Sequence, residues 1–293
     1  MTINLKGLTN AEIQIRDGKA VMEHEGYEYS MDSEQLHKYY ESTYIPPGGA
    51  LVIPDGVKFM RWRKPYLLAV HEHPPMLRNT RWITKDSPSA YGAGTVYRPI
   101  RLSMPYTVTI STYQISDNGA ARNTGANQLF FRTNMLKNVK DNLFYPSLLN
   151  VSVVGQKLDE TWICTQYLKT ATNDTWQDVL VKLLEHLWHG AFNYSSEHHE
   201  GASWFTRYAQ AGIKEITPVE NWETASAAPM FGYKFKNWLP CAYNLEEAIE
   251  RTFKRLNAQP ATELKQARVI ENMAYHLLNY GTKVELNKKK ETQ

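Results

Sequence analysis

The chain has 293 residues, a formal net charge of +3 and an apolar fraction of 42%. This length allows one large domain or two modest ones, and so small a charge gives no reason to expect a nucleic-acid partner. No run reaches the roughly 18 consecutive apolar residues of a membrane span, and the N-terminus lacks a signal-peptide pattern. Two widely spaced cysteines do not suggest a disulfide framework. We therefore expect a cytoplasmic globular protein.

Residues 1–58 have the pattern of an N-terminal extension that contains short strands and one helix. Residues 13–16 alternate between apolar and polar side chains. Asp17 and Gly18 then form a dipeptide that is typical of a tight hairpin turn. Asp32 is a suitable N-cap for the helix that follows. The sequence assigns no role to this extension.

Residues 59–200 form the predicted core, in which strands follow one another without helices between them. Residues 106–111 alternate with a period of two, as expected of a half-buried strand. Such a succession favours an antiparallel meander. The strand-like runs of the chain are residues 50–53, 65–70, 81–83, 97–100, 104–113 and 128–132.

Helical patterns follow the predicted sheet. Residues 176–190 carry an apolar stripe at intervals of three and four, which includes Val179, Leu183 and Leu187. Residues 201–293 are predicted to be a mostly helical C-terminal region. Its expected helices are residues 204–211, residues 245–256 and a stretch from Pro260 to Tyr280. The predicted fold class is therefore α+β: an antiparallel sheet meander with flanking helices and a helical C-terminal region.

The stretch from residue 143 to residue 193 combines features that suggest acyl transfer. Tyr145 and Pro146 precede Asn150, and Cys164 follows in a short apolar run. A polar turn then leads to Trp176 and the amphipathic helix. This order resembles the ubiquitin-conjugating (UBC-like) family, and is closest to its prokaryotic members, in which a His-Pro-Asn motif precedes the active cysteine. The resemblance covers roughly residues 65–195 and implies a UBC-like core.

The resemblance implies that Cys164 forms a thioester with a ubiquitin-like modifier and that Asn150 stabilises the oxyanion during transfer. The implied partners are the modifier, an adenylating activating enzyme and a protein substrate, and no cofactor is implied. The spacing departs from the family motif, because three residues separate Pro146 from Asn150. The alternative is a non-catalytic UBC-like scaffold that binds a modifier or its activating enzyme. In that case Cys164 is a small core residue.

The histidines raise a third hypothesis, a metal- or histidine-dependent hydrolase. His71 and His73 would share one face of a strand, and His186 and His189 would share one face of a helix. No histidine set has the HExxH spacing of a zinc hydrolase. A cysteine peptidase with Cys164 beside His186 or His189 is disfavoured, because the cysteine lies in a strand-like run. We therefore expect no metal and no role for Cys241.

Overall fold

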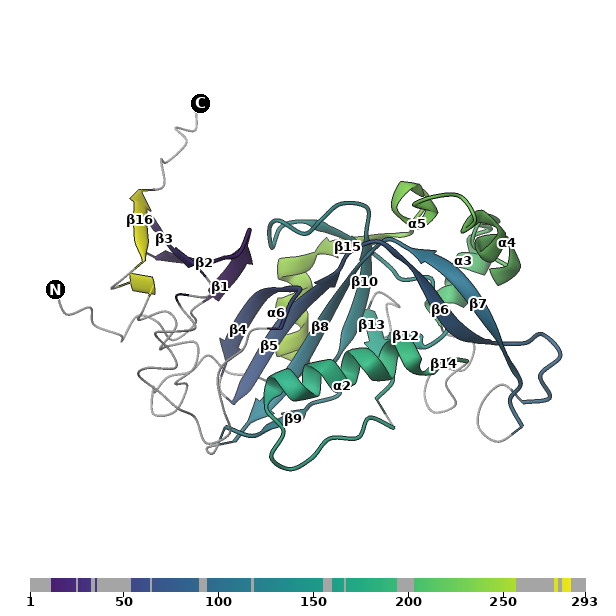
Figure 1. Cartoon of the computed structure of the whole chain (residues 1–293), viewed down its shortest axis with the longest axis horizontal. Coiled ribbons are helices and arrows are strands. Elements are labelled where there is room, and N and C mark those ends of the chain that lie inside the picture. The colour runs from purple at the N-terminus through teal and green to yellow at the C-terminus, as the bar shows by residue number, and fades with distance from the viewer. Residues whose placement is uncertain are drawn as a thin grey trace.

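A computed structural model describes the protein at residues 12–24, 26–32, 35, 54–63, 65–89, 94–116, 119–154, 160–165, 167–193, 203–256, 277–278 and 281–285. Of these residues, 42% lie in strands and 22% in helices. The dominant element is an eleven-stranded antiparallel sheet that runs across the molecule (Figure 1). No described helix is both long and apolar enough to cross a membrane.

The large sheet joins strands from both ends of the described chain. In pairing order they are β15 (Pro240–Asn244), β11 (Asn142–Phe144), β10 (Gln128–Arg132), β8 (Tyr106–Ile115), β5 (Tyr66–His73), β4 (Val57–Arg63), β1 (Glu12–Arg16), β2 (Lys19–His24), β3 (Tyr27–Asp32) and β16 (Thr282–Glu285), with β9 (Ala121–Asn123) paired to β8. The predicted turn at Asp17 and Gly18 joins β1 to β2 as a hairpin, with both residues at positive φ. Strand β5 lies at the centre, between β4 and β8.

Two smaller sheets hold the remaining strands. Strands β6 (Met76–Ile83) and β7 (Tyr97–Met104) form a hairpin, and β14 (Ala191–Phe192) pairs with β6 in parallel. Strands β12 (Val151–Val154) and β13 (Glu160–Ile163) form a second hairpin. The chain leaves the large sheet after β5, where Pro74 and Pro75 cannot donate backbone hydrogen bonds to a neighbouring strand. It returns to the large sheet at β8.

Helices α2 (Trp176–His189) and α6 (Leu245–Arg255) lie on opposite faces of the large sheet (Figure 1). Alternate residues of a strand point to opposite faces. In β5, Ala69 accordingly packs in one cluster with Val179 of α2, whereas Val70 packs in another with Phe253 of α6. The position of a β5 side chain in the strand therefore tells which helix it faces.

The end of the molecule beyond β10 holds an aromatic core. Helices α3 (Trp204–Gln210), α4 (Val219–Ala225) and α5 (Phe231–Lys234) pack there with the two hairpins and the C-terminal half of α2. The largest buried side chains of this cluster are Trp82, Trp188, Phe192, Trp204, Tyr208, Trp222 and Trp238. This core determines where the last turn of α2 lies.

The predicted helix at residues 176–190 is confirmed. Thr175 caps it and forms a reciprocal capping box with Asp178, so two backbone groups that lack helical partners are satisfied. Val179, Leu183 and Leu187 are buried, as the apolar stripe indicates. Gly190 follows the last helical residue.

The predicted fold class is wrong. The structure is dominated by one large antiparallel sheet rather than by a UBC-like α+β core with helical flanks. Strands of the N-terminal region and residues 282–285 extend that sheet, because β1 pairs with β4 and β16 pairs with β3. Sequence periodicity identifies a strand locally, but its neighbours are chosen by contacts with distant residues.

The predicted boundaries at residues 58 and 200 remain predictions. Each of the three predicted segments contributes strands to the large sheet, and β4 spans the first boundary. The predicted strand at residues 50–53 and most of the stretch from Pro260 to Tyr280 lie outside the described residues, as does most of the segment after Asp32.

Candidate active site

The β12–β13 hairpin brings Asn150 and Cys164 to the same end of one ladder. Val151 pairs with Ile163 at that end. Asn150 immediately precedes Val151, and Cys164 immediately follows Ile163. The residues between them in sequence thus include two paired strands. The antiparallel pairing of β12 with β13 therefore brings the two residues to neighbouring positions of the backbone.

The last turn of α2 contacts both residues. The side-chain Nδ2 of Asn150 donates to the carbonyl oxygen of Leu187 at 3.2 Å, and His186 Nε2 donates to the carbonyl oxygen of Cys164 at 2.9 Å. The final carbonyls of a helix lack partners within it, so Leu187 is free to accept. Because a carbonyl oxygen only accepts, His186 Nε2 carries the hydrogen of this contact.

These contacts orient the site and leave hydrogen-bonding capacity. A carboxamide nitrogen carries two hydrogens, and the contact with Leu187 uses one of those of Asn150. The Asn150 Oδ1 atom is buried without a partner. Asn150 and Cys164 are both half-buried. His186 contacts the carbonyl group of Cys164 rather than its sulfur. This contact therefore does not identify His186 as a base for the thiol.

Tyr145, which precedes Asn150 in the predicted motif, has a structural role. Its ring stacks on Trp204 with centroids 3.6 Å apart and an interplanar angle of 7°. Its backbone carbonyl accepts from the Tyr208 hydroxyl at 2.7 Å, and its backbone N–H donates to Leu239 at 2.8 Å. Tyr145 is therefore a core residue that fixes the segment leading to Asn150.

Trp176 and Asp174 lie at the opposite end of α2 from Cys164. Ten residues of helix separate Trp176 from His186, which is about 15 Å along the axis. Asp174 accepts from the Lys182 ammonium at 2.6 Å and from the Ala171 N–H at 2.7 Å. Burial tends to raise the pKa of Asp174, but these two contacts outweigh it and lower the pKa. Asp174 therefore stabilises the start of α2.

The histidines of β5 form a separate polar group on the α2 face of the large sheet. The rings of His71 and His73 have centroids 4.5 Å apart, and His71 Nε2 donates to the Asp55 carbonyl oxygen at 2.9 Å. Burial lowers the pKa of His71 to about 4 and that of His73 to about 3. Among the described residues, no three His, Cys, Asp or Glu side chains are grouped so as to hold a metal ion.

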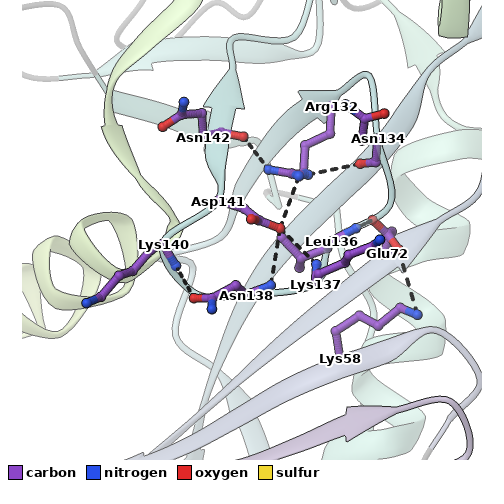
Figure 2. Close-up of polar contacts among 10 residues, drawn as sticks. All are labelled: Lys58, Glu72, Arg132, Asn134, Leu136, Lys137, Asn138, Lys140, Asp141 and Asn142. Carbon is purple, nitrogen blue, oxygen red and sulfur yellow. Dashed lines mark hydrogen bonds and ion pairs between the residues drawn. The ribbon is translucent and has the colours of Figure 1, made fainter. Parts of the chain in front are cut away.

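Glu72, between these histidines in sequence, points to the other face of the sheet. It accepts from the Leu136 N–H at 2.6 Å and lies 3.8 Å from the Lys58 ammonium (Figure 2). Nearby, Asp141 pairs with Arg132 at 3.1 Å. Burial raises the pKa of Glu72, although the Leu136 hydrogen bond and Lys58 oppose the shift. This network ties the segment before β11 to the sheet and is structural.

No family model, no curated protein and no solved structure matches the chain. The resemblance to the UBC-like family therefore remains a prediction that depends on the residues around Cys164.

Sequence reasoning missed two features of this part of the molecule. It considered His186 only as a base or metal ligand, whereas the structure places it as a support for the Cys164 backbone. It also passed over Arg78, which stacks on the ring of Trp188. Arg78 follows Pro74 and Pro75, where the chain leaves the large sheet, but nothing in the sequence shows that this arginine is half-buried against Trp188.

Proposed function

We propose that Cys164 carries an acyl group as a thioester and transfers it from a ubiquitin-like modifier to an amine. The observation that supports this most directly is the convergence of Asn150 and Cys164 at one end of the β12–β13 hairpin, where the last turn of α2 contacts both. The proposal concerns the chemistry of this site and does not require a UBC-like fold.

The first step of the proposed reaction loads the cysteine. The Cys164 thiolate attacks the carbonyl carbon of a thioester between the modifier's C-terminus and the activating enzyme, a new C–S bond forms, and the thiolate of the activating enzyme leaves with the electron pair of the broken C–S bond. ATP consumed by the adenylating enzyme supplies the driving force. Only the ionised thiol is nucleophilic. Because the acyl donor is already activated, the reaction does not require a neighbouring base to generate that thiolate.

The second step discharges the acyl group. An amine of the substrate protein attacks the thioester, the C–S bond breaks, and Cys164 leaves as a thiolate while the amine loses a proton to solvent. Negative charge develops on the carbonyl oxygen in between. The second N–H of Asn150 is suited to donate to that oxyanion, because its first N–H is fixed on Leu187. His186 is a positioning residue, since it holds the backbone of Cys164.

A thioester-exchange experiment tests the proposal without the partner enzyme. The protein is mixed with an aryl thioester of a peptide that ends in Gly-Gly, and the adduct is followed by mass spectrometry. We expect one acyl group on Cys164 that dithiothreitol removes, none on C164A, and unchanged loading on C241A. An adduct that forms equally well on C164A would rule the proposal out.

Discharge onto free lysine then tests Asn150. Loading of N150A is expected to match that of the wild type, while discharge slows by about a hundredfold, as is typical when one oxyanion donor is lost. A variant that discharges at the wild-type rate would show that Asn150 only supports the helix end.

A second candidate, non-catalytic binding of a modifier or its activating enzyme, is favoured by one observation. The imidazole of His186 contacts the backbone of Cys164 rather than its thiol, so this contact does not activate the cysteine. Under this alternative, C164A binds the partner as tightly as the wild type and neither protein forms the adduct.

A further inference from the structure

A group of buried polar side chains lies on the α2 face of the large sheet, outside the Cys164 site. His71 and His73 of β5 pair directly with Thr109 and Thr107 of β8, so all four side chains project from the same face. His71 is 3% exposed, Thr107 1% and Thr109 0%. Ala69, further along the same side of β5, packs in the cluster formed with α2.

Arg78 reaches this group from the start of β6. Its guanidinium carbon lies 3.9 Å from the centre of the Trp188 ring, and that ring lies 6.4 Å from the ring of His73. The positive charge of Arg78 opposes protonation of both histidines and contributes to the lowered pKa values of His71 and His73. The four side chains of β5 and β8, Trp188 and Arg78 thus form one contiguous group at the end of α2.

The hydrogen-bonding capacity of this region is unused. Nε and Nη2 of Arg78, Nε2 of His73, both threonine hydroxyls and Nε1 of Trp188 are buried without partners. In the part of the chain that the structure describes, no carboxylate pairs with Arg78. Burial lowers the pKa of Arg78 only to about 10, so it stays charged. A buried charge without a partner is costly, and native proteins normally satisfy such groups.

The chemistry of these groups defines what would satisfy them. Both histidines are neutral near pH 7, so Arg78 supplies the only positive charge of the group. The threonine hydroxyls and the Trp188 N–H add neutral donors. A guanidinium surrounded by neutral donors suits an oxyanion and repels a metal cation.

We propose that this region is a binding site for a small oxyanion, a carboxylate or phosphate group, with Arg78 as its ionic partner and Thr107 and Thr109 as hydrogen-bond donors. The Trp188 ring holds the guanidinium in place, and the buried end of the large sheet forms the floor of the site. This inference is independent of the proposed reaction at Cys164.

The test is calorimetric titration of the full chain with inorganic phosphate and, separately, with acetate at constant ionic strength. We expect saturable binding of at least one of them, and the preferred anion identifies the phosphate or carboxylate class. R78M is expected to bind at least about tenfold more weakly, because a hydrogen bond to a charged group is lost. R81M is the matched control, since Arg81 lies on the same strand and also over an aromatic ring, that of Tyr97, but is exposed.

T109V provides a second variant of nearly unchanged shape in case R78M does not fold. Removing an unpartnered buried hydroxyl should preserve folding, while it weakens anion binding several-fold. Circular dichroism verifies the fold of each variant. The proposal is overturned if the wild type binds neither anion saturably, or if T109V and every folded Arg78 variant bind as tightly as the wild type.

Discussion

At the scale of single residues, His71 predicts how stability depends on pH. Its ring is buried, and its folded pKa of about 4 lies below its ordinary value of 6.5. The unfolded chain therefore takes up a proton on this ring at a higher pH than the folded chain does. The stabilisation is complete above about pH 6.5 and is lost as the pH falls from there toward about 4, by about 3 kcal/mol in all.

Urea unfolding between pH 7 and pH 4 measures this effect. H71Q is expected to flatten the dependence, because it removes the group that titrates differently in the two states. H189Q is the control, since His189 is exposed at the end of α2. An H71Q protein that loses stability with falling pH as steeply as the wild type would contradict the assignment. Such a result would point to other groups, His73 among them.

At the scale of elements, the turn at Gly56 sets how the segment before β4 packs on the end of β5. Gly56 has a φ of +85°, and a Cβ atom there would lie 2.7 Å from both the Glu72 carbonyl oxygen and His71 Nε2. G56A should therefore cost about 2–5 kcal/mol of unfolding free energy, from backbone strain and overpacking together.

Gly94 separates the two causes, because its φ is +91° but no atom lies within 4 Å of its would-be Cβ. G94A should show the backbone strain alone, about 1–2 kcal/mol. Thermal or urea unfolding of both variants gives the comparison. Equal losses of unfolding free energy in G56A and G94A would mean that the close approach of Gly56 to β5 does not contribute to the cost of G56A.

At the scale of the whole molecule, the large sheet predicts an order of amide protection. Strand β5 has neighbours on both sides and helices over both of its faces, whereas the described residues of β16 are exposed and pair with β3. Amides of Leu68 and Ala69 should exchange only with global unfolding, while those of β16 should exchange through local opening. Native-state hydrogen exchange by mass spectrometry measures both. Similar protection for the two strands would contradict this order.

The whole fold also shows which of its features could be predicted from the sequence. The stripe of α2 and the Asp17-Gly18 hairpin could be predicted, because each depends on residues close together in the chain. The pairing of β1 with β4 and of β3 with β16 could not, because it joins strands whose patterns fit many partners. At the candidate site, Cys164 and Asn150 could be singled out by residue type, but their meeting depends on the β12–β13 register, which sequence spacing alone does not reveal.

The departure of the chain from the large sheet at Pro74 and Pro75 has a consequence for folding kinetics. Pairing β5 with β8 must close the long segment between them, and such non-local contacts slow folding because chain entropy is lost before the contacts form. Within that segment, β6 and β7 already pair with each other. An early β6–β7 hairpin would shorten the effective loop, so the central strands would join after it, and folding rate would be sensitive to substitutions in a hairpin outside the large sheet.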